Sequence, residues 1–418
     1  MRAYGVPYKG SKNQLAEALV EALPTRGADT FVDLFAGGCA VTHAALVRGR
    51  YKRYVANDID GQGVRLFMDS VRGKHRDERR WISREDFERL KATDPYVALC
   101  WSFGNNGKNY LYSREIEPWK KALHYARALG DRSLMEEFGI HTDGSRADIV
   151  AHADEYKRRY IRWWLSRQPY TADELDALIA KTRADIDREG EELRQYLLRG
   201  LRSSGLTQAE VQRRLGTQMA GHYFGRSQWG FPTEEYYNMM RTFMPSLDQD
   251  YNELVGLRRL WESLQSLQSL ESLESLERLQ SLERLERLQR LQNLETSFKS
   301  YDEVEIPEGS VVNCDPPYRG TDGYGDGGFD HAAFYDWCER QTELVVVSEY
   351  DMPRGRFVGV WSKPHRSRLC ATANKGVTER LFVPRRQARR YYEMLGRPRA
   401  VQLELFPDKG RGRQATGQ

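Results

Sequence analysis

Short apolar runs and helical stretches alternate near both ends of the chain. Residues 31–35 (FVDLF) form an apolar run that ends at a glycine turn, a helical stretch follows over 40–47, and a second apolar run occupies 53–58 (RYVAND). Strand, glycine turn, helix and strand in this order are typical of a βαβ unit in a parallel sheet. The pattern returns only after residue 300, with strands predicted over 310–314, 343–350, 355–361 and 380–384. We therefore expect one α/β domain that is formed by two separated parts of the chain.

The middle of the chain has a different character. Residues 100–256 are helical in pattern and rich in arginine and aromatic side chains. We expect an inserted, mainly helical domain there, which divides the α/β domain into a first part at 1–99 and a second part at 297–407. The last residues, 408–418 (DKGRGRQATGQ), are small and polar, so a disordered tail is expected.

Residues 257–296 form a low-complexity segment in which leucine recurs at every third position from Leu264 to Leu294. The residues between the leucines are mostly good helix formers. Because an α-helix turns by about 100° per residue, successive leucines drift by about 60° and their stripe winds around the helix. We predict a long helix whose leucines need more than one neighbour, and a second subunit of a homodimer is one candidate. A short-repeat solenoid is the alternative.

Composition narrows the class of protein. The 418 residues are 40% hydrophobic and 11% aromatic, as expected for packed domains, and the net charge of +4 is only weak evidence of a polyanionic partner. The five cysteines form no C-x-x-C pair, which favours reduced thiols over disulfides or a zinc site. No apolar run approaches the roughly 18 residues of a membrane span. We expect a soluble cytoplasmic protein with neither a metal nor a membrane partner.

The stretch FVDLFAGG (31–38) carries the first chemical signal. A strand that ends in glycines permits a tight turn and the close approach of a ligand before a helix begins. The stretch resembles the motif that opens the S-adenosylmethionine site of class I methyltransferases. In that resemblance Asp33 would face the methionyl end of the cofactor, beside Phe35, Gly37 and Gly38. An ordinary glycine turn is the alternative.

Two further segments are candidates for the same cofactor site. Asp58, at the end of the second predicted strand, could accept hydrogen bonds from ribose hydroxyls, as acids do in dinucleotide-binding folds. A helix N-cap is the alternative for Asp58, and Asp60 competes for the ribose role. The loop PYKGSK (7–12) could wrap the cofactor carboxylate, with Lys12 as counter-charge and Tyr8 as packing surface. A flexible basic N-terminus is the alternative there.

The run Asp315-Pro316-Pro317-Tyr318 directly follows a predicted buried strand. Amino groups on nucleobases are poor nucleophiles, because the nitrogen lone pair is delocalised into the ring. The Asp315 carboxylate and the Pro316 carbonyl could accept hydrogen bonds from both amino hydrogens and so favour a tetrahedral nitrogen. Two prolines keep the loop stiff, and Tyr318 could stack on a base rotated out of a duplex. A stiff turn is the plainer alternative, but it leaves the carboxylate and the aromatic ring unexplained.

The order PYKGSK, FVDLFAGG, NDID, a long insert, DPPY, FDHAAFYDW, VVVSEYDMP and ERLFVP resembles the Dam-type DNA adenine methyltransferase family. The resemblance covers residues 1–115 and about 297–384. It implies a Rossmann-like class I methyltransferase fold with a mixed sheet flanked by helices, an inserted target-recognition domain, S-adenosylmethionine as cofactor and double-stranded DNA as substrate. It also implies that Asp315 borders the cofactor. The family often has an acid and an aromatic residue shortly before DPPY; here the pair is Ser300-Tyr301, so only Tyr301 could stack against the cofactor.

Candidate DNA contacts lie mainly in the insert. Residues 206–229 resemble a helix-turn-helix: Thr207 and Glu210 have the spacing of a capping box, Gly216 ends the first helix, and Thr217 could cap a second one. The side chains that could read base edges there are Gln218, His222, Arg226 and Gln228. A helical hairpin with polar faces is the alternative.

Two other basic segments suit phosphate contacts. Residues 155–167 (EYKRRYIRWWLSR) interleave Arg158, Arg159 and Arg162 with aromatics, although a solvated helix face is nearly as good an interpretation. The loop 102–113 presents Lys108 among amides and tyrosines, and an ordinary surface loop explains it equally well.

The leading hypothesis from the sequence is a sequence-specific DNA adenine N6-methyltransferase that acts on a flipped base. Cytosine N4 methylation is a near alternative, because that amino group poses the same chemical problem. A non-catalytic DNA-binding regulator that uses the helix-turn-helix is the alternative from another class, and it leaves DPPY and the glycine motif without a purpose.

Overall fold

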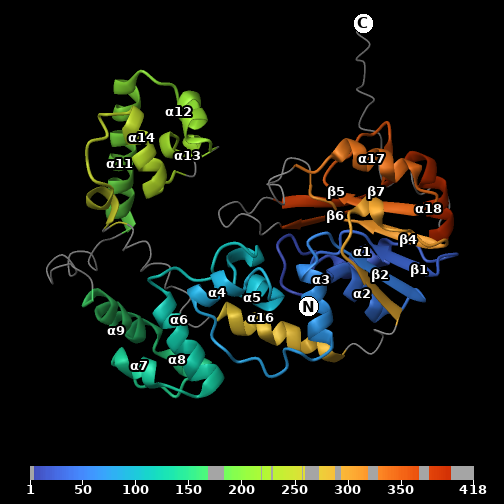
Figure 1. The fold of residues 1–418 in the computed structure, drawn as a ribbon, viewed down its shortest axis with the longest axis horizontal. Coiled ribbons are helices and arrows are strands. Elements are labelled where there is room, and N and C mark those ends of the chain that lie inside the picture. Colours follow the sequence, from blue (N-terminus) through green and yellow to red (C-terminus); the bar gives the residue numbers. More distant parts are fainter. Residues whose placement is uncertain are drawn as a thin grey trace, which may run out of the picture. The chain divides into compact units, whose positions relative to one another are not determined.

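The computed structural model describes residues 4–167, 183–217, 219–226, 229–256, 258, 273–287, 293–318, 328–366 and 376–396. The chain forms two compact units (Figure 1). Unit 1 comprises Met1–Leu111 and Glu274–Gln418, and unit 2 comprises Tyr112–Leu273. The boundaries at 111 and 274 place residues 100–111 and the end of the leucine-triplet segment in unit 1, together with both predicted parts of the α/β domain.

Unit 1 is built on a seven-stranded mixed sheet with the strand order β3-β2-β1-β4-β5-β7-β6. Neighbouring strands from β3 to β5 run parallel, whereas β7 is antiparallel to both β5 and β6. The strands are β1 (Thr30–Asp33), β2 (Arg53–Asn57), β3 (Leu294–Ser297), β4 (Ser310–Cys314), β5 (Leu344–Glu349), β6 (Phe357–Arg366) and β7 (Gly376–Pro384). This arrangement is that of a class I methyltransferase fold, and the predicted fold class is confirmed.

Alternating side chains of the strands form two apolar layers, because successive residues of a strand point to opposite faces. On one face Val32, Val312 and Val345 pack in a buried cluster with Phe334 and Trp337 of α17 (His331–Arg340). On the other face the Tyr54 hydroxyl donates to the Ala45 carbonyl of α2 (Ala40–Arg48). The central strands β1, β4 and β5 are buried along their whole length, as expected for a sheet covered on both faces.

The edge strand β3 corrects one prediction. The strand pattern returns at Leu294, before residue 300, and inside the segment predicted to be helical. β3 reads LETS and none of its residues is buried, because it pairs on one side only, with β2. A short polar edge strand has no apolar run that a sequence pattern could detect.

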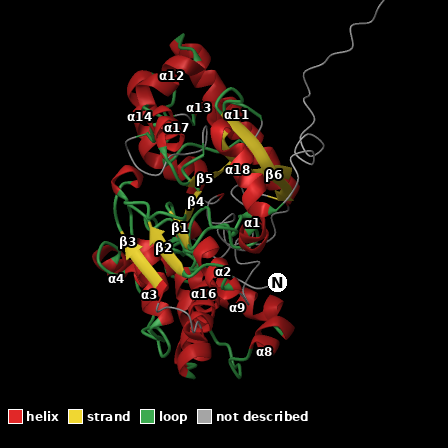
Figure 2. Cartoon of the chain, turned by 90° about the vertical axis from the view of Figure 1, so that its right-hand side faces the viewer, coloured by secondary structure: helices red, strands yellow, loops and turns green. Residues whose placement is uncertain are grey.

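The described end of the leucine-triplet segment forms α16 (Glu274–Glu283), followed by a 3-10 turn at Arg284–Arg287. Leu279, Leu282 and Leu285 are buried, and α16 contacts α3 (Gln62–Val71, Figure 2) and α5 (Pro95–Cys100, Figure 1) of the same unit. The helix that carries Leu279 and Leu282 therefore has two neighbouring helices, α3 and α5, within unit 1. Residues 259–272 and 288–292 of the segment lie outside the described residues.

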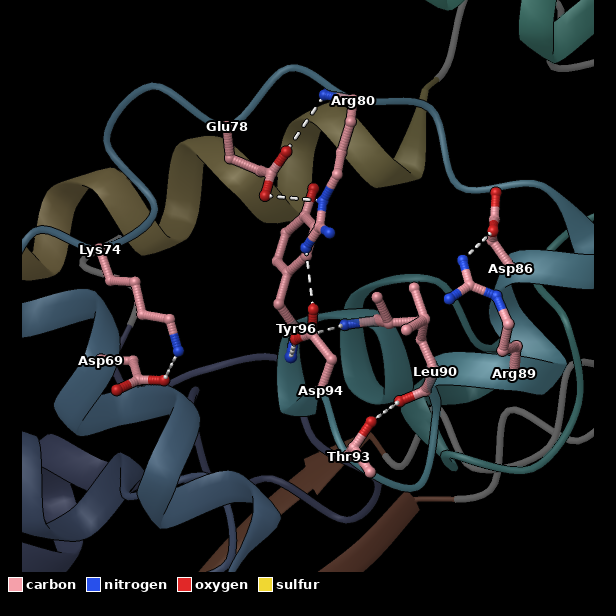
Figure 3. Close-up of polar contacts among 11 residues, drawn as sticks. Asp69, Lys74, Glu78, Arg80, Asp86, Arg89, Leu90, Thr93, Asp94 and Tyr96 are labelled. Carbon is pink, nitrogen blue, oxygen red and sulfur yellow. Dashed lines mark hydrogen bonds and ion pairs between the residues drawn. The ribbon is translucent and has the colours of Figure 1, made fainter.

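Polar contacts hold the connection between α3 and α5 (Figure 3). Arg80 bridges the carboxylates of Glu78, at 3.0 Å, and Asp94, at 2.8 Å, and its guanidinium lies 5.6 Å from the centre of the Tyr96 ring. Asp94 caps α5 by accepting from the backbone N–H of Tyr96 at 3.0 Å. These contacts anchor the segment that leads into the loop 102–111.

The remaining helices of unit 1 are α1 (Ala16–Ala22), α4 (Arg84–Leu90) and α18 (Ala388–Leu395), with 3-10 turns at Phe103–Asn105, Tyr301–Glu303 and Arg385–Gln387. Unit 2 contains α6 (Glu117–His124), a π-helical turn (Tyr125–Leu129), α7 (Ser133–Glu137), α8 (Arg146–Ala151), α9 (Ala153–Leu165), α11 (Arg183–Ser204), α12 (Gln208–Leu215), α13 (Ala220–Phe224) and α14 (Glu234–Phe243). None of the described helices is both long and apolar enough to span a membrane.

The helix-turn-helix segment differs from its prediction in the second helix. The capping box forms as expected: Glu210 accepts from the Thr207 N–H at 2.7 Å, and the helix α12 ends at Gly216 with φ +63°. The second helix, α13, begins only at Ala220 with Met219 at its N-cap, so Thr217 does not cap it directly. α13 is five residues long, and it packs with α11, α12 and α14 around a core that includes Val211, Tyr223 and Tyr237.

Candidate active site

The loop 4–12 lies directly against the glycine turn that follows β1. Gly37 has φ +48°, and a Cβ atom at that position would lie 2.9 Å from the ring of Tyr8. A Cβ at Gly38 would lie 2.7 Å from the Val6 carbonyl oxygen, and the Val6 N–H donates to the Gly38 carbonyl at 2.8 Å. Gly37 is therefore required by its positive φ and by the Tyr8 ring, and Gly38 by the close approach of the Val6 backbone. The structure brings Tyr8 to the turn.

Asp58 joins the turns that follow β1 and β2. Its Oδ2 accepts from the Gly37 N–H at 2.8 Å, and its Oδ1 accepts from the Asp60 N–H at 3.1 Å. Burial raises the pKa of Asp58 above its usual value, although the Gly37 N–H opposes the shift. A carboxylate has about four lone-pair positions, so these two bonds leave acceptor capacity for hydroxyl groups. Asp60 itself is exposed and is hydrogen-bonded to Tyr8.

Two exposed apolar side chains that lie near Asp58 are not among the site residues predicted from the sequence. Ile59 is 72% exposed and Phe298, directly after β3, is 41% exposed. The Phe298 ring covers Gly61, where a Cβ atom would lie 2.7 Å from it, and the Arg65 guanidinium lies 4.6 Å from the ring centre. Ile59 could have been found from the sequence, because it is an apolar residue directly after the acid that ends a predicted strand. Phe298 could be found only once β3 was known.

Phe35 and Tyr301 lie together in an aromatic cluster. Their ring centres are 5.7 Å apart in a stacked arrangement, and Tyr301 meets the ring edges of Phe334 at 5.2 Å and Trp337 at 5.5 Å. Tyr301 is half-buried against the α17 face of the sheet. Phe298, three residues before Tyr301, is the aromatic residue that directly follows β3.

Asp33 lies beneath the glycine turn and is only 1% exposed. Its Oδ2 accepts from the Thr42 hydroxyl at 2.6 Å and from the Thr42 N–H, in the first turn of α2, at 3.1 Å. Its Oδ1 accepts from Asn313 Nδ2 at 3.0 Å. Burial raises the pKa of Asp33 to about 6, against these hydrogen bonds. The structure thus places Asp33 beneath the glycine turn, where it joins the first turn of α2 to β4.

The glycine turn and the DPPY run lie side by side because β1 and β4 are parallel neighbours. Asp33 is in register with Asn313, two residues before Asp315. β1 and β4 are the strands between which the strand order reverses, where α/β sheets bind their ligands. The two motifs, nearly 280 residues apart, therefore form one site at the carboxyl ends of the strands.

Lys12 pairs with the first residue of DPPY. Its Nζ lies 2.7 Å from Oδ1 and 2.8 Å from Oδ2 of Asp315, and both side chains are largely shielded from solvent. The same Nζ lies 4.5 Å from the centre of the Tyr318 ring. Lys12 was predicted as counter-charge for a cofactor carboxylate; the described structure pairs it with Asp315. Pro316 is buried and Pro317 is half-buried beside them.

Tyr318 is held by groups from three segments. Its hydroxyl donates to the carboxylate of Glu379 on β7, and its ring meets that of Tyr350 edge to face at 4.8 Å. Burial, with the carboxylates of Asp315 and Glu379, raises the pKa of Tyr318 well above its usual value, so the hydroxyl stays neutral. A hollow of about 490 Å³ opens beside the ring pair and is lined by residues 349–354.

The candidate DNA contacts are described each within its own unit. Lys108 is exposed in unit 1 on a loop that is closed by hydrogen bonds from its own N–H and that of Asn109 to Asn106. In unit 2 Arg158 and Arg162 are exposed on α9, whereas Arg159 pairs with Glu155 at 2.7 Å and donates to the Gly139 carbonyl. Arg226 is exposed and His222 is half-buried; Gln218 and Gln228 lie outside the described residues.

The described residues contain no group of three or more His, Cys, Asp or Glu side chains that could hold a metal ion. The described cysteines, Cys39, Cys100, Cys314 and Cys338, are all buried thiols.

Comparison with known families agrees with this site. Residues 8–135 match the family of D12 class N6 adenine-specific DNA methyltransferases. No curated protein matches the chain. The matched range includes Tyr8, Lys12, the glycine turn and Asp58, and DPPY follows in the part of unit 1 beyond it. Residues 8–135 are thus similar to the D12 class of N6 adenine-specific DNA methyltransferases, and the sheet of unit 1 has the order of a class I methyltransferase fold.

Proposed function

We propose that this DNA adenine methyltransferase transfers the methyl group of S-adenosylmethionine to the N6 amino group of an adenine flipped out of duplex DNA. The observation that carries the proposal is the joint placement of Lys12, Asp315 and Tyr318 beside the glycine turn, at the carboxyl ends of β1 and β4. The proposed site is assembled from three segments that are far apart in the sequence.

The residues at the strand ends fit the cofactor. Gly37 and Gly38 leave the backbone of the turn open to close approach, and Asp58 retains acceptor capacity for ribose hydroxyls. Ile59 and Phe298 are exposed apolar side chains at neighbouring strand ends, which suits a flat adenine ring. Tyr8 borders the turn. When bound, S-adenosylmethionine supplies an electrophilic methyl group.

Asp315 and the Pro316 carbonyl would accept the hydrogen bonds of the two amino hydrogens. Asp315 can do so without releasing Lys12, because one carboxylate oxygen can stay on Nζ while the other accepts from the amino group. The two prolines keep the acceptors in place, and Tyr318 supplies a ring for stacking with the flipped base. Positioning of the amino nitrogen supplies much of the acceleration.

Unit 2 would bind the duplex. Arg158 and Arg162 on α9 are exposed and suit phosphate contacts, as does Lys108 of unit 1. The helix-turn-helix-like segment, with His222 and Arg226 and the predicted Gln218 and Gln228, would read base edges in the major groove. The homodimer and the cytoplasmic location stay predictions from the sequence.

The experiment is methylation of mixed-sequence duplex DNA with labelled S-adenosylmethionine, followed by nucleoside mass analysis. We expect label in N6-methyladenine with the wild-type protein and none with Asp315→Ala. Asp336→Ala, which removes an exposed carboxylate of α17, is the matched control and should retain the wild-type rate.

Other outcomes discriminate between the alternatives. Label in N4-methylcytosine would keep the mechanism and change the base. Absence of label from all three proteins, with tight DNA binding retained and unaffected by Asp315→Ala, would overturn the proposal in favour of a non-catalytic DNA-binding regulator.

A further inference from the structure

Glu379 is a buried carboxylate on strand β7 of unit 1. It lies on β7 opposite Lys363 of β6, and it is only 1% exposed. A carboxylate is costly to bury unless a partner satisfies it. The partner is the Tyr318 hydroxyl, which donates to Glu379 Oε1. The contact joins β7 to the DPPY run, 61 residues earlier in the chain.

The hydroxyl contact completes the restraint of the Tyr318 ring. The Tyr350 ring meets it edge to face at 4.8 Å, with the two planes 89° apart, and Lys12 Nζ lies 4.5 Å from its centre. A tyrosine side chain has two torsion angles, so an anchor at the hydroxyl end, together with packing around the ring, leaves one orientation. A ring that is already oriented costs less to order when a base arrives.

The positive charge of Lys12 acts on both carboxylates next to the Tyr318 ring, Asp315 and Glu379. Lys12 forms an ion pair with Asp315, and its charge also acts on Glu379, where it lowers the pKa against the larger effect of burial, which raises it. Lys12 thus pairs directly with Asp315, whereas the group that Glu379 contacts directly is the Tyr318 hydroxyl. Glu379 does not need to touch a substrate to affect the reaction.

We infer that Glu379 is a positioning residue for methyl transfer: its carboxylate anchors the Tyr318 hydroxyl and sets the ring orientation in which the target base is received. The inference rests on the proposed function. It assigns a role to Glu379 on the antiparallel strand β7, whose stretch ERLFVP (379–384) is part of the sequence resemblance but was given no role there. The role is exerted through Tyr318, so it disappears when the Tyr318 hydroxyl is absent.

The test is a double-mutant cycle in single-turnover methyl transfer to mixed-sequence duplex DNA. Glu379→Ala should lower the rate about 10- to 100-fold, as misplacement of a reacting group does, with S-adenosylmethionine binding unchanged. Tyr318→Phe, which removes only the hydroxyl, should have a similar effect. In the Tyr318→Phe protein, Glu379→Ala should add less than about 2-fold, because coupled residues are not additive.

Two variants serve as controls. Glu379→Gln keeps the volume and an acceptor oxygen, so it should retain more activity than Glu379→Ala and remains informative if the alanine variant does not fold. Glu343→Gln changes another buried glutamate, which pairs with Arg390 at the opposite end of β5, and should leave the rate unchanged. Equal losses from Glu379→Ala with and without the Tyr318 hydroxyl would overturn the inference.

A second readout does not need activity. In protein labelled with 3-fluorotyrosine, the Tyr318 resonance is assigned by its loss in Tyr318→Phe. Glu379→Gln should shift and broaden this resonance, and Glu343→Gln should not. An unchanged resonance refutes the anchor even in an active enzyme. A wild-type protein that transfers no methyl group to DNA would instead refute the proposed function. The fluorine resonance would then test only whether Glu379 binds the Tyr318 hydroxyl.

Discussion

Three carboxylates at the carboxyl edge of the sheet have different environments. Asp33 is enclosed by Thr42 and Asn313, Asp58 holds two backbone N–H groups, and Glu379 accepts from Tyr318. Burial raises the pKa of each of them. Asp315, by contrast, pairs directly with a cation, Lys12. The negative charge of the group proposed to act on the amino hydrogens is therefore balanced.

Asp33→Asn should change how stability depends on pH. The pKa of Asp33 is about 6 in the folded protein against an ordinary value of 3.8 for an aspartate carboxyl group. A raised pKa means that the folded protein binds the proton more tightly, so the contribution to stability is full below pH 4 and is lost as the pH rises through 6. The shift corresponds to at most about 3 kcal/mol.

Thermal unfolding of Asp33→Asn and wild type between pH 4 and pH 8 checks this expectation. The variant should gain stability relative to the wild type as the pH rises, and the gain should level off above pH 7. Asp77→Asn, at an exposed position, is the control. A difference between Asp33→Asn and wild type that does not change with pH would contradict the assignment.

At the scale of elements, the glycine turn that follows β1 is packed between α3 and the N-terminal loop. A Cβ atom on Gly63 of α3 would lie 2.1 Å from the Gly37 carbonyl oxygen, and one on Gly5 would lie 2.3 Å from the Gly38 carbonyl oxygen. Backbone thus packs on backbone from both sides of the turn. The glycines of three segments act together to bring the turn, the loop and the helix into one layer.

Gly63→Ala should destabilise the protein, although alanine is the better helix former by about 1 kcal/mol. The added methyl group would force backbone apart, at a cost of about 1–3 kcal/mol, and would displace the turn. The free energy of unfolding and S-adenosylmethionine binding, measured by denaturant titration and calorimetry, should both fall. Gly355→Ala has open space around its Cβ and should change neither. A Gly63→Ala protein with the wild-type free energy of unfolding would contradict this prediction, because it would show that α3 can move away from the turn without loss of stability.

At the scale of the whole molecule, two units of different construction share one chain. Unit 1 holds a sheet and the candidate active site, whereas every regular element described in unit 2 is helical. Unit 2 carries exposed arginines on α9 and the short helix pair α12 and α13. This division fits the proposed function, in which unit 1 receives one base and unit 2 contacts the polyanion.

Combined substitution Arg158→Gln and Arg162→Gln should weaken DNA binding and its dependence on salt. Each phosphate contact contributes about 0.9 to the slope of log affinity against log salt concentration, so the slope should fall by about 2. Fluorescence anisotropy on duplex DNA across a salt series measures it.

The charge-matched control for this prediction is Lys52→Gln with Arg53→Gln. These exposed residues precede and begin β2, away from the carboxyl edge of the sheet, and pair with Asp29 and Glu295. An equal fall of the slope in the control would show that net charge alone, and not α9, governs binding.

The local chemistry of the site could be predicted from the sequence. FVDLFAGG and DPPY each combine a strand signal with residues that force a particular turn, and glycine and proline act on their own backbone torsions wherever they occur. The strand-turn-helix pattern at both ends, the capping box at Thr207 and the glycine stop at Gly216 are local in the same sense. Such features need no knowledge of distant contacts.

Only the tertiary structure decided which distant groups meet. Lys12 binds Asp315 across 303 residues, and Glu379 reaches Tyr318 from a strand whose antiparallel direction the sequence pattern does not encode. The polar strand β3, the exposure of Phe298 and the burial of Asp33 follow from pairing and layering, which depend on the whole sheet. The sequence by itself thus determined the chemical groups and their local turns, because these depend on neighbouring residues. The partners, burial and charge balance of those groups were decided by packing over long chain separations.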